Sequence, residues 1–147
     1  MSMKFRTLEN AAVNDNFGLL AKALAGDVVI KLSQSTAAPT AAECAAAAQV
    51  YDIGIRLETA AGELHSWYNG KVLLAITDDD STGAASIDPA AGEISLVNGE
   101  GSVEVTMDKA VWTAGKKATL TVSKPTSAKA PVMETVANAT FIATVAS

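Results

Sequence analysis

Histidine and cysteine are residue types that often act in catalysis or bind metals, and this sequence contains one of each. His65 lies between Leu64 and Ser66 in a segment that reads as a strand. A catalytic triad or a histidine-ligated metal would need partners that converge on His65 from elsewhere in the fold. Glu43 precedes Cys44, and its negative charge opposes thiolate formation. We therefore expect a structural or solvent-facing histidine, a buried unreactive thiol, and neither zinc nor any cofactor.

Asp78, Asp79 and Asp80 form the one acidic cluster of the sequence. Hard cations such as calcium prefer several carboxylate ligands, so a metal site is one reading of this cluster. The alternating acidic spacing of a calcium-binding EF-hand loop is absent, and Ser81 to Gly83 continue with turn-forming residues. We therefore interpret these three aspartates as solvated side chains in a turn that follows a strand.

Trp67, Tyr68 and Trp112 could stack on a sugar or a nucleobase if all three were exposed together. Only 5% of the residues are aromatic, so large rings are scarce for filling a core. We therefore expect these rings to pack in the core and at its rim, with Trp112 closing one end. With no residue set that supports catalysis, the sequence predicts a protein that is not an enzyme.

Composition limits the class of protein further. A chain of 147 residues suits one domain that can bury its own core, and 49% of its residues are hydrophobic. The net charge is −5 and there is no run of Lys or Arg, which argues against nucleic-acid binding. No apolar stretch approaches the ~18–20 residues that span a bilayer, so we expect no membrane partner. No hydrophobic signal segment follows Lys4 and Arg6, which predicts synthesis and retention in the cytoplasm.

Alternating apolar and polar residues predict about seven or eight short strands. Asn69-Gly70 favours a type I′ turn, so we expect it to join strands Leu64–Tyr68 and Lys71–Thr77 as a hairpin. Strands separated by turn residues in this way are typical of an antiparallel sandwich. The other expected strands are 27–32, 51–58, 94–97, 103–107, 118–122 and 136–145.

Two segments have helical features instead. Thr40 and Glu43 have the spacing of a capping box, and the alanines that follow to Ala48 favour a short helix. Near the start of the chain, apolar residues recur at helical spacing up to a stop at Gly26. This N-terminal helical arm could cover the sandwich or dock on a neighbouring subunit, and the pattern leaves both readings open. The recurring residues are Val13, Phe17, Leu20 and Leu24.

The expected organisation is therefore mainly β, an antiparallel sandwich with an N-terminal helical arm and one short inserted helix. Residues 1–26 form the arm and residues 27–123 the sandwich. Residues 124–147 form a proline-containing linker and a last strand.

Several segments resemble bacterial and phage immunoglobulin-like domains. Residues 57–70 are similar to a strand that ends in an Ala-Gly turn and is followed by a strand bearing tryptophan. Residues 97–105 and 114–122 look like the closing strands of such a domain, so the resemblance covers roughly residues 50 to 123. It implies an immunoglobulin-like sandwich. It also implies a place on the virion, since such domains in phage genomes are head decoration (cement) proteins or tail appendages.

The expected function is a structural protein of the bacteriophage virion, made in the host cytoplasm, that decorates the capsid. It would bind across neighbouring subunits of the major capsid protein, or of another virion protein, as a homo-oligomer. The alternative is a carbohydrate- or receptor-binding module of a phage tail or bacterial surface assembly. The interface residues expected for decoration are Phe5, Arg6, Phe17, Leu20 and Leu24, together with the proline-containing C-terminal segment.

Overall fold

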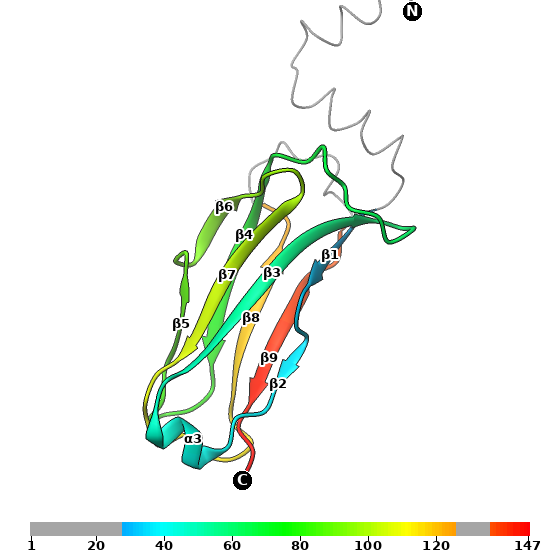
Figure 1. Ribbon diagram of the computed structural model, residues 1–147. Helices are drawn as coiled ribbons and strands as arrows, with labels where there is room; N and C mark the ends of the chain where they lie inside the picture. Colours follow the sequence, from blue (N-terminus) through cyan, green and yellow to red (C-terminus); the bar gives the residue numbers. More distant parts are fainter. Residues whose placement is uncertain (1–27, 126–135) are drawn as a thin grey trace, which may run out of the picture.

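The structure, a computed structural model, describes residues 28–125 and 136–147 and consists of two packed β-sheets (Figure 1). One sheet, here sheet A, has the strand order β1-β3-β7-β5, and sheet B has the order β2-β9-β8-β4-β6. All pairs are antiparallel except β2 with β9. The elements are β1 (Val28–Leu32), β2 (Thr36–Ala37), α3 (Ala41–Ala46), β3 (Gln49–Thr59), β4 (Lys71–Asp78), β5 (Ala85–Asp88), β6 (Gly92–Ser95), β7 (Glu100–Met107), β8 (Lys117–Ser123) and β9 (Ala139–Thr144).

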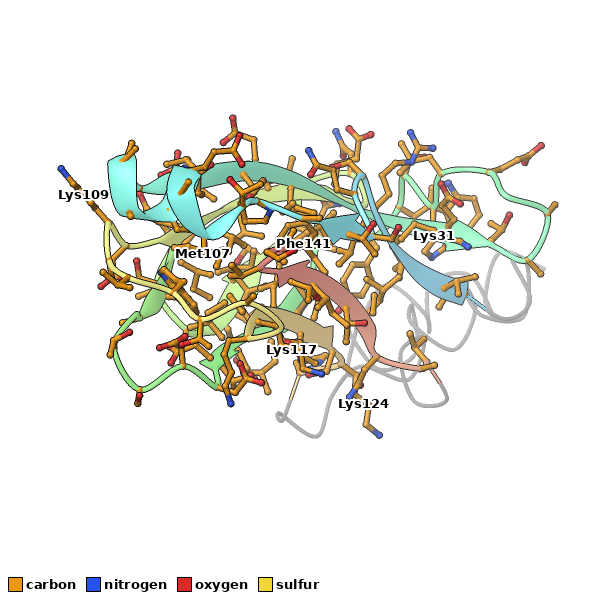
Figure 2. The ribbon with its side chains drawn as sticks, turned by 90° about the horizontal axis from the view of Figure 1, so that it is seen from below. Lys31, Met107, Lys109, Lys117, Lys124 and Phe141 are labelled. Atoms are coloured by element: carbon orange, nitrogen blue, oxygen red, sulfur yellow. The ribbon has the colours of Figure 1, made fainter. Side chains whose placement is uncertain are left out.

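Alternation along the strands builds the core, as the sequence predicts. Three inward positions of β3 and three of β7 are buried and face the inward positions of β4, β8 and β9; they are Ile53, Ile55, Leu57, Val103, Val105 and Met107. Figure 2 shows Met107 and Phe141 between the sheets, whereas Lys109, Lys117 and Lys124 lie at the periphery. Because aromatic residues are few, aliphatic side chains fill most of this layer. They include Ile53, Ile55, Leu57, Val72, Leu74, Val103, Val105, Leu120 and Val122.

The predicted capping box is confirmed at the start of α3. The Thr40 hydroxyl accepts the Glu43 amide at 3.2 Å, and the Glu43 carboxylate accepts the Thr40 amide at 2.8 Å. The helix lies across one end of the sandwich (Figure 1) and buries Cys44 completely. Burial and the adjacent Glu43 raise the pKa of the Cys44 thiol. The prediction of a small buried thiol is therefore confirmed.

The predicted strand Leu64–Tyr68 and its hairpin at Asn69-Gly70 are wrong. Residues 60–70 form a loop with a single bridge between Glu58 and Leu64. A tight hairpin is impossible here, because the loop carries the chain from β3 in sheet A to β4 in sheet B. Gly70 does not adopt the positive φ of a type I′ turn. A Cβ at Gly70 would lie 2.6 Å from Cζ of Tyr68, so the ring of Tyr68 requires the glycine.

Two short strands, β2 and β5, have no counterpart in the sequence-based prediction. At 2 and 4 residues they are too short for alternation to reveal. β2 follows β1 and moves the chain from the edge of sheet A to the edge of sheet B. β9 lies inside sheet B between β2 and β8, so the final strand of the chain is an integral part of the sandwich.

Candidate binding surfaces

One end of the sandwich, opposite α3, collects several loops; we call it the Trp67 end. Val28, where the chain enters β1, pairs with Thr59 at the end of β3, and the loop bearing Trp67 follows directly. The β6–β7 turn bearing Val97 lies at this end too, as Figure 1 shows. Trp67 is 49% exposed and Val97 66% exposed. Two of the large exposed apolar side chains therefore lie at the same end of the molecule.

Hydrogen bonds hold the two loops of the Trp67 end together. The Asn98 amide donates to the side-chain oxygen of Asn69 at 2.8 Å, and the Gly99 amide donates to the Tyr68 carbonyl at 2.7 Å. Asn98 and Gly99 have φ values of 52° and 77°, which gives a two-residue turn of the type expected at the other Asn-Gly pair. These hydrogen bonds brace the loop that carries Trp67, so its conformation is fixed in the unbound protein.

Tyr68 braces the base of the same loop. Its hydroxyl donates to the Lys71 carbonyl at 2.7 Å, and burial raises its pKa to about 12. The ring is half-buried, so Tyr68 packs at the rim as predicted and offers little surface to a ligand.

His65 lies beneath this end and is buried, with 4% of its surface exposed. Its ring is 6.2 Å from that of Trp67, centroid to centroid. Among the described residues, its Nε2 atom is enclosed without a hydrogen-bond partner. Burial therefore lowers the pKa of His65 from its ordinary 6.5. The structural role expected for this histidine is confirmed.

Because the folded protein disfavours protonated His65, stability should fall on mild acidification. Above its unfolded pKa the ring is neutral in both states and adds no pH dependence. Below about pH 6.5 the unfolded chain takes up a proton that the folded protein resists, so the free energy of unfolding decreases down to the lowered folded pKa. Urea unfolding at about pH 7.5 and pH 5.5 measures this loss. His65→Phe should show a smaller loss, and equal losses in both proteins would contradict the prediction.

Asp78, Asp79 and Asp80 use their carboxylates to fasten loops at the end that carries α3. Asp80 accepts the amides of Thr113 at 2.7 Å and Thr82 at 2.8 Å, which joins the β4–β5 and β7–β8 loops. These hydrogen bonds, that of Thr113 foremost, lower the pKa of Asp80. Asp79 accepts the Lys117 amide and Asp78 the Ala85 amide. The expectation of merely solvated turn residues is therefore wrong.

Over the described parts of the chain, the structure shows no group of three or more His, Cys, Asp or Glu residues placed to hold a metal ion. The carboxylate oxygens of the acidic cluster accept backbone amides, which is a structural use of charge.

Trp112 closes the end of the sandwich that carries α3, as predicted. It is 1% exposed, its Nε1 donates to the Asp108 carbonyl at 3.1 Å, and its ring lies against Gly83. Trp67 lies at the opposite end, so a stacking platform of Trp67, Tyr68 and Trp112 is not formed. The sequence predicts that Trp67 packs in the core or at its rim, whereas Trp67 is 49% exposed, because strand alternation does not say which loop residues become covered.

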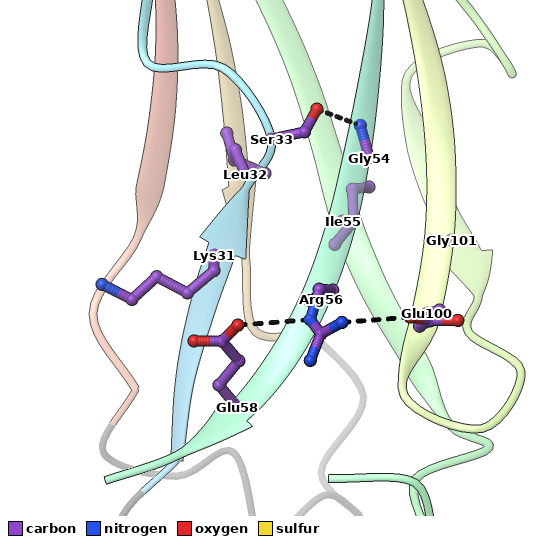
Figure 3. Close-up of a pocket in the computed structure, with 9 residues that line it drawn as sticks. All are labelled: Lys31, Leu32, Ser33, Gly54, Ile55, Arg56, Glu58, Glu100 and Gly101. Atoms are coloured by element: carbon purple, nitrogen blue, oxygen red, sulfur yellow. Dashed lines mark hydrogen bonds and ion pairs between the residues drawn. The ribbon is translucent and has the colours of Figure 1, made fainter. Parts of the chain in front are cut away.

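The outer side of sheet A is the charged face. Across its strands, Lys31 lies opposite Arg56 and Arg56 opposite Glu100. Figure 3 shows a shallow hollow here, bordered by Ser33, whose side chain is small, and by Gly54, which has no side chain. Arg56 pairs with Glu58 at 3.2 Å and with Glu100 at 3.5 Å. With carboxylates on both sides, this guanidinium is already neutralised and is poorly suited to capture an anion.

The charged face is acidic beyond this hollow. Asp52 lies opposite Glu104, and Glu104 lies opposite Asp88, so three carboxylates form one row across β3, β7 and β5. Like charges directly opposite each other repel, and this row faces solvent.

The outer side of sheet B, the neutral face, has a different composition. Its central positions carry no charge, and the paired ions Lys71 and Glu93, 3.9 Å apart, lie at one margin while Lys117 lies at the other. Thr121 at the centre has Ala75 and Thr140 as its cross-strand neighbours. Apart from Lys71 and Lys117, the outward residues of β2, β4, β8 and β9 are Thr36, Leu73, Ala75, Thr77, Thr119, Thr121, Ser123, Thr140, Ile142 and Thr144.

The expected interface residues Phe5, Arg6, Phe17, Leu20 and Leu24 lie outside the described residues, as does most of the proline-containing segment. The described chain meets these segments at Val28, Pro125 and Val136. Within residues 28–125 and 136–147, no helix has the length and hydrophobicity needed to cross a membrane.

The strand order of the two packed sheets defines the class: the chain is a mainly β, immunoglobulin-like sandwich. It is similar in fold to WR4, a member of the MSP family of C. elegans, with 9% identity, a TM-score of 0.44 and coverage of 80% of this chain and 97% of that one. The ASH/PapD-like domain 7 of human CEP192 is similar too, with 9% identity, a TM-score of 0.44 and coverage of 79% and 84%.

A beta-glycosidase from Bacteroides vulgatus contains a similar region. It has 12% identity and a TM-score of 0.46 over 81% of this chain but only 14% of that enzyme. All three likenesses concern the fold alone. No protein-family model and no curated protein sequence matches the chain.

Proposed function

We propose that the protein is a structural subunit of a bacteriophage virion that decorates the capsid and has no catalytic activity. It would bind across neighbouring subunits of the major capsid protein, and stabilise the head because only the assembled shell presents the complete binding surface. The observation that carries this proposal is the Trp67 end, with a half-exposed tryptophan on a braced loop.

Chain topology supports the choice of this end. In the sequence, the expected arm of residues 1–26 lies before β1, and the proline-containing segment lies between β8 and β9. Val28, the first residue of β1, pairs with Thr59, and Ser123, the last residue of β8, pairs with Leu73. Thr59 ends the strand before the Trp67 loop, and Leu73 lies near the start of the strand after it. The segments expected to contact the shell are thus attached at the end that carries Trp67 and Val97.

The chemistry of this end suits a protein partner. Exposed tryptophan side chains supply a large share of binding free energy in many interfaces, and a loop fixed in advance loses little conformational entropy on binding. Tryptophan and valine here carry no charge that would have to be desolvated.

Binding to purified heads of the phage or prophage that encodes the chain tests the proposal. Deletion of residues 1–26 should abolish co-sedimentation, and Trp67→Ala should weaken binding about 30-fold or more, since a binding hot spot contributes about 2 kcal/mol. Val111→Ala is the matched control, because Val111 is 74% exposed at the opposite end and should bind normally. Unchanged binding by the deletion and by Trp67→Ala would overturn this assignment.

Recognition of carbohydrate is a second candidate, favoured by the exposure of Trp67 alone. Soluble polysaccharide from host cells should then change the emission of Trp67 but not that of buried Trp112. A response that persists in Trp67→Phe would contradict this reading.

A further inference from the structure

We infer that the neutral face of sheet B is a self-association surface that pairs two copies of this chain, sheet against sheet. This inference is independent of capsid binding, which we assign to the Trp67 end. It rests on the distribution of charge over the two outer faces and on the area that the neutral face offers.

The first step concerns composition. Depletion of charged residues is what distinguishes the centre of a protein interface from ordinary surface. The neutral face has threonine, serine, alanine and two aliphatic side chains across β2, β9, β8 and β4, and its charged groups lie only at the margins. The charged face has the opposite character, with Lys31, Arg56 and a larger number of carboxylates.

The second step concerns charge between two copies. The chain has a net charge of −5, so any dimer must keep its acidic groups apart. Pairing through the charged face would bring the row of Asp52, Glu104 and Asp88 against the same row of the other copy. Pairing through the neutral face stacks four sheets, about 10 Å apart, and so separates the acidic rows by about 30 Å. Since the Debye length is about 8 Å in physiological salt, little repulsion remains at that distance.

The third step concerns area. Strands lie about 4.8 Å apart and rise about 3.4 Å per residue, so the described part of the neutral face covers about 500 Å² in projection. Two copies would bury about 1,000 Å² in total, which is near the lower limit for a specific interface. The pairing is therefore expected to be reversible and concentration-dependent, with the same face used by both copies around a two-fold axis.

Single charges at the centre of the neutral face test the inference. Thr121→Lys and Ala75→Glu each place a charge next to its own counterpart in the partner, so both should convert the dimer to monomer despite their opposite signs. Ser102→Lys and Ser102→Glu are the matched controls, because Ser102 is an exposed small residue on the charged face. They change the net charge equally and should leave the dimer intact.

Light scattering over a hundredfold range of concentration, on the full chain, gives the mass of each protein. Circular dichroism checks that every variant is folded. A wild-type dimer lost in both neutral-face variants and kept in both controls supports the inference. A wild-type protein that stays monomeric, or a dimer that both neutral-face variants retain, overturns it. Neither outcome affects the capsid-binding test, which uses heads and the Trp67 variants.

Discussion

Trp112→Ala should lower the free energy of unfolding by about 3–5 kcal/mol, the range for removing a buried aromatic ring. The ring closes the core at the end that carries α3, and its removal leaves a cavity against Gly83. It also leaves the Asp108 carbonyl without the indole donor. A loss of that size is a large fraction of the total stability of a domain, so a substantial unfolded fraction at physiological temperature is expected.

Urea unfolding followed by far-ultraviolet circular dichroism measures this loss, provided that the slope with denaturant stays constant. Val111→Ala is the control, because a side chain that is 74% exposed should contribute less than about 0.5 kcal/mol. Similar losses in the two variants would mean that Trp112 does not fill the core.

Gly99→Ala should have the second-largest effect and lower the free energy of unfolding by about 3 kcal/mol, the sum of left-handed strain and a steric collision. Gly99 has a φ of 77°, and a Cβ at this position would collide with the backbone carbonyl of His65. That oxygen belongs to the braced loop of the Trp67 end, so relief requires the loop to move and break the bond from the Gly99 amide to Tyr68. Left-handed strain and the loss of these contacts therefore add together.

Gly62→Ala provides a close comparison. Gly62 has a φ of 86°, but a Cβ there meets nothing within 4 Å, so only the left-handed strain of about 1–2 kcal/mol is expected. Thermal and urea unfolding of the two variants separate the contribution of strain from that of collision. If Gly99→Ala loses no more than Gly62→Ala, the loop must be able to move without cost.

The same pair of variants bears on the proposed function. Under solution conditions in which both remain folded, Gly99→Ala should also weaken binding to phage heads, because it displaces the loop that presents Trp67. Gly62→Ala should not.

Much of the sandwich follows from local sequence patterns. From Ile53 to Leu57 in β3 and from Val103 to Met107 in β7, every second residue is apolar and buried, because successive side chains point to opposite faces of a sheet. The start of α3 also depends only on neighbouring residues, since Thr40 and Glu43 satisfy each other's backbone amides. Burial of Cys44 agrees with the general behaviour of such thiols.

The binding surfaces could not be predicted in the same way. Which residues share the Trp67 end depends on which sheet each strand joins, and alternation carries no such information. Likewise, the charged and neutral faces appear only when the strands are set in register, because each contributes a few outward residues from distant parts of the sequence.

The two Asn-Gly pairs illustrate where local sequence stops being decisive. Asn98-Gly99 forms the tight turn that this dipeptide favours, but Asn69-Gly70 does not, because its loop must cross between sheets and Tyr68 packs on the glycine. The sequence by itself determined the short helix and most of the longer strands, because these depend on neighbours along the chain. Only the tertiary structure decided that Trp67 is half-exposed at the end opposite Trp112 and that the aspartates fasten loops, because those outcomes depend on contacts between residues far apart in sequence.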